Sequence, residues 1–192
     1  MKNILIINGH PHKESLNFGL AEAYKKGALA SGYQLEEIVI ADLNFNPNLQ
    51  YGYQKRMELE PDLLDAWEKI KRADHMVWVH PVWWGGLPAI TKGFIDRLFL
   101  PGFTFKPREN SVWWDKLLTG KTARIIATMD QPGWYYRWIN HQPSVYQLKK
   151  GTLEFCGVKP VKVCYIGIVK TATEKQRAKW LTQVKQLGMK GK

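Results

Sequence analysis

Five short apolar runs recur along the chain, and segments with helical periodicity lie between them. The first run, Lys2–Asn8, contains four consecutive aliphatic residues, a pattern typical of a strand buried on both faces of a parallel sheet. We predict the five strands at 2–8, 35–40, 76–79, 121–128 and 161–168. Because helical segments alternate with these strands, the pattern predicts an α/β fold: a five-stranded parallel sheet with helices on both faces.

Residues that favour helix ends mark where each helix begins or stops. Serine and threonine are good N-caps, proline suits the first helical turn, and glycine suits the position after the last turn. On this basis the helices begin near Ser15, Pro61, Pro88, Ser144 and Thr173, with Gly32 and Gly157 ending the first and the fourth. The stretch 99–120 is predicted to be irregular, with a short hairpin at 103–105.

The composition is that of one globular domain covering residues 1–192, with 45% hydrophobic and 23% charged residues. No apolar run approaches the length of a membrane span, and the N-terminal run is too short for a signal peptide. Cys156 and Cys164 lie inside predicted elements, where a small buried hydrophobe is preferred over a catalytic thiol. Two such cysteines suit a reduced compartment better than a disulfide framework, so we expect a cytoplasmic location.

The net charge of +11 favours anionic partners: phosphorylated cofactors, nucleic acid or acidic lipid. The lysines and arginines are scattered, with a mild concentration toward the C-terminus. No helix-turn-helix, zinc or RNA-binding motif accompanies them, so we prefer a solvated basic face and expect no nucleic-acid partner. Nucleic-acid binding is the weakest alternative, and salt-sensitive affinity for DNA would support it.

The loop 9–17, between the first strand and the first helix, has the features of a phosphate site. Free backbone N–H groups and the positive end of the helix dipole face such a loop. His10, Ser15 and Asn17 add side chains that can donate hydrogen bonds. Because the loop matches neither a dinucleotide fingerprint nor a Walker loop, an ordinary turn capped by Ser15 is the alternative. A phosphate loop at this place favours the flavodoxin-like strand order 2-1-3-4-5.

Ligands in such sheets bind beyond the carboxyl ends of the strands, where the loops after the first, third and fourth strands are expected to meet. The second of these loops contains Trp83-Trp84-Gly85-Gly86. We expect the N–H groups of 82–85 to meet the polar edge of a flat ring while the indoles pack on its apolar part. A tryptophan pair that fills the core is the alternative, and we prefer ligand contact.

The third loop is rich in aromatic residues and spans 129–143, with Trp134, Tyr135, Tyr136, Trp138 and His141. A loop of this composition is either a dimer contact or the wall of a pocket for a flat ligand. Tyr135 and His141 carry polar tips that can donate protons or hydrogen bonds, although a single histidine is more often structural or exposed. Together the three loops predict a planar heteroaromatic ligand that carries a phosphate, such as FMN or the inner half of FAD.

The block Pro81–Phe99 is similar to the signature Pro-x-x-Trp…Pro-x-x-x-Lys-x-x-x-(Asp/Glu)-Arg-(Val/Leu)-Phe of the flavodoxin-like NAD(P)H:quinone oxidoreductases, the DT-diaphorase family. That group includes bacterial drug-activity modulators and potassium-efflux ancillary proteins. Gly9-His10 with Ser15-Leu16-Asn17 resembles the family's phosphate loop, and 153–157 resembles its Phe-Cys-Gly helix end. The resemblance covers nearly the whole chain.

The resemblance implies a flavin whose phosphate is held by the first loop and whose isoalloxazine lies along the second. It implies a homodimer with two active sites at the interface. It also implies a tyrosine and a histidine six residues apart near the flavin, a spacing that the candidate catalytic residues Tyr135 and His141 match. No metal site is expected. The candidate cofactor-binding residues are His10, Ser15, Leu16, Asn17, Pro81, Val82, Trp83, Trp84, Gly85, Thr128, Met129 and Asp130.

Three departures from the family pattern bear on the cofactor. Thr128-Met129-Asp130-Gln131 stands where many relatives have Thr-Thr-Gly-Gly, so Asp130 is expected to meet the flavin edge differently. Gly85 replaces a common aromatic residue, which opens the pocket. The segment before Pro61 and the C-terminal part are shorter than in relatives that clasp adenine dinucleotide. These features favour FMN, with FAD left open.

The first hypothesis is a ping-pong oxidoreductase, in which NAD(P)H delivers hydride to the flavin and a quinone or similar acceptor then takes the electrons. His141 and Tyr135 would stabilise the negative charge of the reduced flavin by hydrogen bonding. The second hypothesis is a flavin-binding ancillary subunit of a potassium-efflux channel, which would associate with the membrane peripherally. The sequence leaves open the electron acceptor and the choice between NADH and NADPH.

Overall fold

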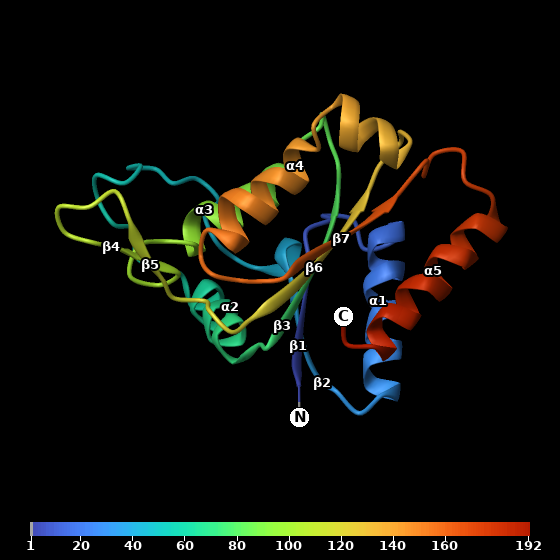
Figure 1. Cartoon of the computed structure of the whole chain (residues 1–192), viewed down its shortest axis with the longest axis horizontal. Helices are drawn as coiled ribbons and strands as arrows, with labels where there is room; N and C mark the ends of the chain where they lie inside the picture. The colour runs from blue at the N-terminus through green and yellow to red at the C-terminus, as the bar shows by residue number, and fades with distance from the viewer. Residues whose placement is uncertain (1) are drawn as a thin grey trace.

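Residues 2–192, the part of the chain that the structure describes, form a parallel sheet covered by helices in the computed structural model shown in Figure 1. The five strands lie in the order β2-β1-β3-β6-β7, which is the flavodoxin-like order 2-1-3-4-5 predicted from the sequence. Every neighbouring pair of these strands is parallel. From one edge to the other the strands are β2 (Gln34–Val39), β1 (Asn3–Asn8), β3 (His75–Pro81), β6 (Thr122–Thr128) and β7 (Val161–Ile166).

Different helices cover the two faces of the sheet (Figure 1). α1 (Leu16–Ala30) and α5 (Glu174–Met189) lie side by side on one face. The other face is covered by α2 (Pro61–Arg72), α3 (Ala89–Leu98) and a helical segment made of α4 (Pro143–Tyr146) and the π-helix η3 (Gln147–Glu154).

Side chains of the central strands alternate between these two helical layers. In β1, Ile4 and Ile6 pack in the cluster with α1 and α5, whereas Leu5 and Ile7 belong to the larger cluster with α2 and α3. All four side chains are buried. Because water reaches neither face, the strand reads as a continuous apolar run rather than as an alternating one.

A buried ion pair attaches the long segment before α2 to α3. Arg97 donates to both carboxylate oxygens of Glu60, at 3.0 and 2.8 Å, and to the carbonyl oxygen of Glu58 at 2.8 Å. The Arg97 side chain is 1% exposed, so its charge needs a paired carboxylate. One turn earlier, Gly93 packs so closely that an added Cβ would lie 2.5 Å from Cβ of Pro47. The arginine of the signature block therefore has a structural role in this chain.

The structure corrects three details of the predicted elements. Ile40 belongs to a short 3₁₀ turn, η1 (Ile40–Asp42), rather than to the second strand. The hairpin lies further along the chain than predicted, at β4 (Phe105–Pro107) and β5 (Trp114–Lys116). Part of the third loop is a π-helical turn, η2 (Tyr135–Ile139).

Other local signals agree with the structure. Thr173 caps α5 through a reciprocal capping box with Gln176. Cys156 and Cys164 are buried, and burial raises the pKa of both thiols, which fits a hydrophobic role. Within residues 2–192, no helix has both the length and the apolar character needed to cross a bilayer.

We expect Gly27→Ala to destabilise the protein because α1 and α5 make backbone contact at this residue. A Cβ at Gly27 would lie 2.0 Å from the carbonyl oxygen of Lys185, so the helices would have to separate. Overpacking of this kind costs about 1–3 kcal/mol, which urea unfolding measures.

Gly19→Ala on the same helix is the matched control. Its Cβ would lie 3.5 Å from Leu181, an ordinary contact, and the helix propensity of alanine should raise stability by up to about 1 kcal/mol. Equal stability of the two variants would contradict the expected cost at Gly27.

Candidate functional site

The loops that follow β1, β3 and β6 meet at the carboxyl edge of the sheet, and direct contacts join them. At the end of β6, the hydroxyl of Thr128 donates to the side-chain oxygen of Asn17 in α1 at 2.9 Å. The rings of His10 and Trp83 pack edge to face, with centroids 5.6 Å apart. The N–H group of Val82 donates to the carbonyl oxygen of Thr128 at 2.8 Å. The three loops are therefore one structural unit.

The first loop leaves several buried polar groups without a partner. Ser15 occupies the N-cap position of α1 with extended backbone angles, but its hydroxyl makes no capping hydrogen bond. Its Oγ and the side-chain nitrogens of Asn8 and Asn17 are buried and have no hydrogen-bond partner within residues 2–192. Buried polar groups are nearly always hydrogen-bonded, so these donors beside a helix N-terminus suit an external acceptor.

His10 is held by two hydrogen bonds within the same loop. Its N–H group donates to the side-chain oxygen of Asn8, and the N–H group of His12 donates to its Nδ1, both at 3.0 Å. Burial, reinforced by His12, lowers the pKa of His10, so the ring is neutral at pH 7. Because Nδ1 accepts, the neutral ring carries its proton on Nε2 and can donate there.

Asn8 orders the first loop, although the sequence did not single it out as a site residue. It is the last residue of β1, and it is buried at the point where the strand meets the loop. A polar side chain closing an otherwise apolar strand was the signal available in the sequence.

The second loop contains a tight two-residue turn. Trp83 and Gly86 exchange backbone hydrogen bonds at 3.1 and 2.9 Å, and the central residues Trp84 and Gly85 have φ values of 50° and 76°. Such a turn needs left-handed backbone at both central positions, which glycine adopts freely and tryptophan adopts with strain. The N–H groups of Val82 and Trp83 bond inside the protein, so only two of the four predicted donors, those of Trp84 and Gly85, lack an acceptor within residues 2–192.

Exposed aromatic side chains mark both the second and the third loop. Trp84 is 106% exposed and Trp83 is 45% exposed, so this pair does not fill the core. In the third loop, Trp134, Trp138 and Ile139 are each more than half exposed. Apolar surface of this kind suits contact with a ligand or with another protein surface.

Tyr136 joins the third loop to the second. It is buried, and its hydroxyl donates to the carbonyl oxygen of Gly85 and accepts from the N–H group of Ser144, both at 3.0 Å. Burial raises the pKa of Tyr136, so the hydroxyl keeps its proton. Ser144 is not the helix cap that we predicted: Gln142 holds that position, and Ser144 is buried inside α4.

The candidate catalytic residues flank the π-helical turn η2. Tyr135 is its first residue, 38% exposed, and its carbonyl oxygen accepts from the N–H group of Asn140 at 3.1 Å. His141 is exposed and lies two residues beyond the end of the turn, after Asn140. His141 and Gln142 have φ values of 54° and 47°. Two consecutive non-glycine residues in the left-handed region indicate local strain, which is frequent at functional sites.

A cavity of about 580 Å³ lies between the second and third loops. This volume is in the range of small-molecule sites. Two hydrogen bonds hold its walls: Gln131 accepts from the side chain of Asn140 at 3.0 Å, and the Asp130 carboxylate accepts from the N–H group of Lys170 at 2.6 Å. The predicted residues that line it are Val82, Trp84, Gly85, Met129 and Asp130, joined by Gln131, Asn140 and Pro143.

The other predicted site residues, including Trp83, Thr128, Tyr135 and His141, are not part of the lining of this cavity. His10, Ser15 and Asn17 form the first loop described above, and Leu16 begins α1 and packs against the cluster on that face. Pro81 is buried as the last residue of β3.

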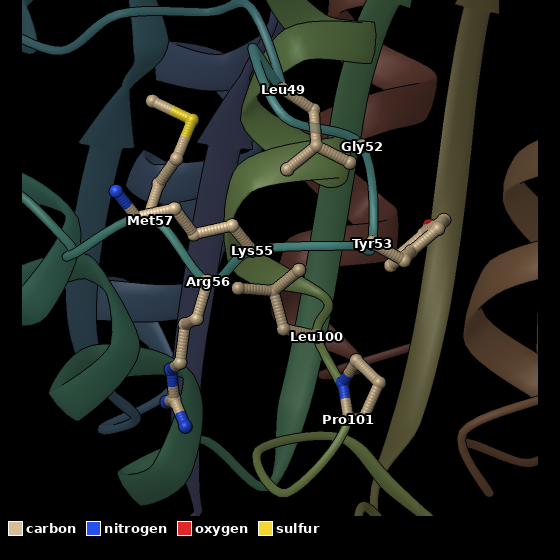
Figure 2. A pocket seen from close by; sticks show the side chains of 8 residues that line it. All are labelled: Leu49, Gly52, Tyr53, Lys55, Arg56, Met57, Leu100 and Pro101. Atoms are coloured by element: carbon tan, nitrogen blue, oxygen red, sulfur yellow. The ribbon is translucent and has the colours of Figure 1, made fainter.

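A second cavity, of about 280 Å³, lies outside the three loops (Figure 2). It is built from the segment 49–57 and the residues just after α3, and Figure 2 shows Leu49 and Leu100 on facing walls. Arg56 lies over the ring of Phe103, with its guanidinium carbon 4.9 Å from the centroid. The lining of this second cavity includes none of the residues predicted for the site, so the cavity is not part of that site.

Comparison with known proteins identifies the family. A family model described as flavodoxin-like fold matches residues 2–187. The chain belongs to this flavodoxin-like family. Rat NAD(P)H dehydrogenase (quinone) 1 is 24% identical over 198 residues, covering 87% of this chain and 70% of the relative. An uncharacterized NAD(P)H oxidoreductase of Haemophilus influenzae is 27% identical over 181 residues, covering 91% and 88%.

Solved structures share the flavodoxin-like fold of this chain. Smu.1420 from Streptococcus mutans has a TM-score of 0.86 and 28% identity, covering 98% of this chain and 99% of that one. The NAD(P)H:quinone oxidoreductase from Methanothermobacter marburgensis has a TM-score of 0.84 and 22% identity, covering 100% and 99%. Together with the family match and the curated relatives, they confirm the resemblance to the flavodoxin-like NAD(P)H:quinone oxidoreductases.

One buried histidine lies at the end of β3, just before the second loop. His80 precedes Pro81 in β3, and its Nδ1 lies 3.1 Å from the Pro81 carbonyl oxygen. A carbonyl only accepts, so Nδ1 carries the proton, and Nε2 has no partner within residues 2–192. Burial lowers the pKa of His80 to about 4, so the ring is neutral near pH 7.

We expect His80 to make stability fall as the pH drops from about 6.5 to about 4. The unfolded chain binds this proton near the ordinary pKa of 6.5, whereas the folded protein binds it only near pH 4. Protons therefore favour the unfolded state in this window, by about 3 kcal/mol at its lower end.

Urea unfolding of the parent and of His80→Phe across this pH range tests the expectation. As the pH falls to about 4, the free energy of unfolding of the parent should decrease by about 3 kcal/mol relative to that of His80→Phe. The subtraction removes the contribution of His75, whose pKa is also lowered by burial, to about 3. Parallel pH profiles for the two proteins would contradict the role of His80.

Proposed function

We propose that this chain is a flavin-dependent oxidoreductase of the NAD(P)H:quinone class, with residues 1–192 forming one flavin-binding domain. The observation that carries the proposal is that the first loop, which holds buried donors without a partner within residues 2–192, contacts Trp83 and Thr128, the neighbours of two residues that line the cavity of about 580 Å³. The rat and Methanothermobacter marburgensis proteins support the reaction class, since both are named as quinone oxidoreductases.

The residues of the first loop fit a phosphate group. Ser15 and Asn17 hold buried donors without a partner within residues 2–192, and His10 offers an Nε2–H donor next to the positive end of α1. One phosphate ester would satisfy these donors, so we favour FMN over FAD. A structure of the same fold supports this choice: an FMN-dependent NADH-azoreductase of Bacillus anthracis, 17% identical with a TM-score of 0.76, was solved in complex with FMN.

A bound flavin would supply the hydride chemistry that links a nicotinamide donor to a quinone acceptor. The N–H groups of Trp84 and Gly85 are available to donate to the polar edge of a flat ring in the cavity. The exposed indole of Trp84 would cover such a ring and exclude water. Tyr135 and His141 would donate hydrogen bonds to negative charge that develops there. Because both substrates would use the same cavity in turn, we expect ping-pong kinetics.

The enzyme is favoured over the potassium-efflux ancillary subunit, because the relatives named above are described as oxidoreductases.

We further propose a homodimer. The exposed side chains of Trp134, Trp138 and Ile139 support it, since a second copy of the chain would cover them.

We expect Ser15→Ala to weaken FMN binding through the phosphate alone. Losing one hydrogen bond to a charged group costs about 2 kcal/mol, or roughly 30-fold in Kd. Riboflavin, which lacks the phosphate, should bind the parent and the variant with equal affinity, and fluorescence titration measures both ligands.

Ser31→Ala, at the opposite end of α1, is the matched control and should leave both affinities unchanged. If riboflavin lost as much affinity as FMN in Ser15→Ala, Ser15 would not be a phosphate ligand.

The proposed activity is tested by the colour of the purified protein. It should be yellow or become so with FMN, lose its colour when NADPH is added without oxygen, and regain it with a quinone. A protein that binds neither FMN nor FAD would refute the proposal.

We expect His141→Gln to slow the reduction of the bound flavin by NADPH about 100-fold in stopped-flow measurements, because it removes a donor to developing negative charge. Its affinity for FMN should stay at the parental value, which serves as the control for folding. Reduction at the parental rate would exclude His141 from the mechanism.

A further inference from the structure

A third cavity, of about 350 Å³, lies against the edge strand β7 and is not used by the proposed flavin site. Residues of η2, of the α4–η3 segment and of β7 build it. It adjoins the cavity between the second and third loops, because Gln142 lines it while the neighbouring residues Asn140 and Pro143 line the other. A molecule longer than a flavin ring could therefore extend from one cavity into the other.

The lining of this cavity carries an excess of positive charge. Arg137, Lys149 and Lys150 contribute three cations, and none of the lining residues is acidic. The carboxylate of Glu154 lies 2.6 Å from Nζ of Lys150 but 3.9 Å from that of Lys149. Arg137 forms no ion pair within residues 2–192, and its guanidinium lies 5.8 Å from the ring centroid of Trp138. Three cations thus face a single carboxylate, which leaves an excess of two positive charges at this cavity.

Two tyrosines complete the cavity. The hydroxyl of Tyr165 donates to the side-chain oxygen of Gln142, which fixes both groups at the boundary between the two cavities. Burial raises the pKa of Tyr165, and the charge of Arg137, which lines the same cavity, opposes this rise. Tyr146 is 61% exposed at the rim and offers a flat apolar face.

We propose that this cavity binds the adenosine 2′-phosphate of NADPH and makes the protein prefer NADPH to NADH, an inference that rests on the proposed function. The two nicotinamide cofactors differ only in that phosphate. A phosphate monoester carries about −1.5 to −2 charges at pH 7, which matches the excess charge of Arg137 and Lys149. Arginine and lysine are the usual partners of such groups, and aromatic faces such as that of Tyr146 stack on bases.

The first test measures binding without catalysis. Calorimetric titration of the FMN-loaded protein with adenosine 2′,5′-bisphosphate should give at least about tenfold tighter binding than with 5′-AMP, because only the former carries the 2′-phosphate. Arg137→Gln and Lys149→Gln should each reduce the affinity for the bisphosphate about tenfold and leave that for 5′-AMP unchanged. Lys149→Arg, which keeps the charge, should retain most of the affinity.

Lys162→Gln is the matched control. It removes a lysine from β7 next to Val163, which lines the cavity, but its side chain is exposed on the opposite face of the strand, the face shared with Cys164. Its affinities should equal those of the parent. Equal affinity of the parent for the bisphosphate and 5′-AMP, or no loss in the Arg137 and Lys149 variants, would overturn the proposal.

The second test measures kcat/KM for quinone reduction with NADPH and with NADH. The parent should favour NADPH through KM, and each cavity variant should lose about tenfold with NADPH and nothing with NADH. Equal use of both donors by an active parent overturns the proposed cavity role while the oxidoreductase function stands. Selective bisphosphate binding without any quinone reduction upholds the cavity and refutes the proposed function.

Discussion

The central strands can be fully buried only because helices cover both faces of the sheet. In β1, successive aliphatic side chains enter the two helical layers in turn, so none of these four side chains faces water. A parallel strand must then return through a helix outside the sheet before the next strand begins. Every strand therefore ends at the same rim, and the loops after Asn8, Pro81 and Thr128 gather there. The position of the candidate site is a consequence of this topology.

Hydrogen bonds among the loops convert this proximity into a defined geometry. Thr128 bonds Asn17, and Tyr136 bonds the backbone of both Gly85 and Ser144. The atoms in these contacts have hydrogen-bond partners, whereas the hydroxyl of Ser15 has no partner within residues 2–192. A buried unpaired polar group costs about 1–3 kcal/mol, so the fold carries a cost at the first loop that an anionic ligand would offset.

The net charge of the chain does not show where in the fold positive charges are paired and where they are in excess. The chain carries +11 overall, yet much of the basic surface is paired, as in Lys25 with Glu37 and Arg72 with Glu36. At the cavity against β7 the balance is different, because a single carboxylate, that of Glu154, pairs with Lys149 and Lys150, and Arg137 forms no ion pair within residues 2–192. Charge counted along the sequence says nothing about this imbalance, since it arises where η2, η3 and β7 meet.

Local patterns in the sequence determined the α/β fold, the strand order and the three loops of the site, because strand burial and helix ends follow from neighbouring residues. Thr173 and its capping box could be predicted for the same reason. Only the tertiary structure decided that Ser144 is buried inside a helix, that Tyr136 is a structural link, and which N–H groups of the second loop stay unbonded. Those outcomes depend on partners distant in the chain, as in the hydrogen bond that joins Asn17 to Thr128 across 111 residues. No local periodicity encodes such a partner, because it is chosen by packing once the whole sheet has formed.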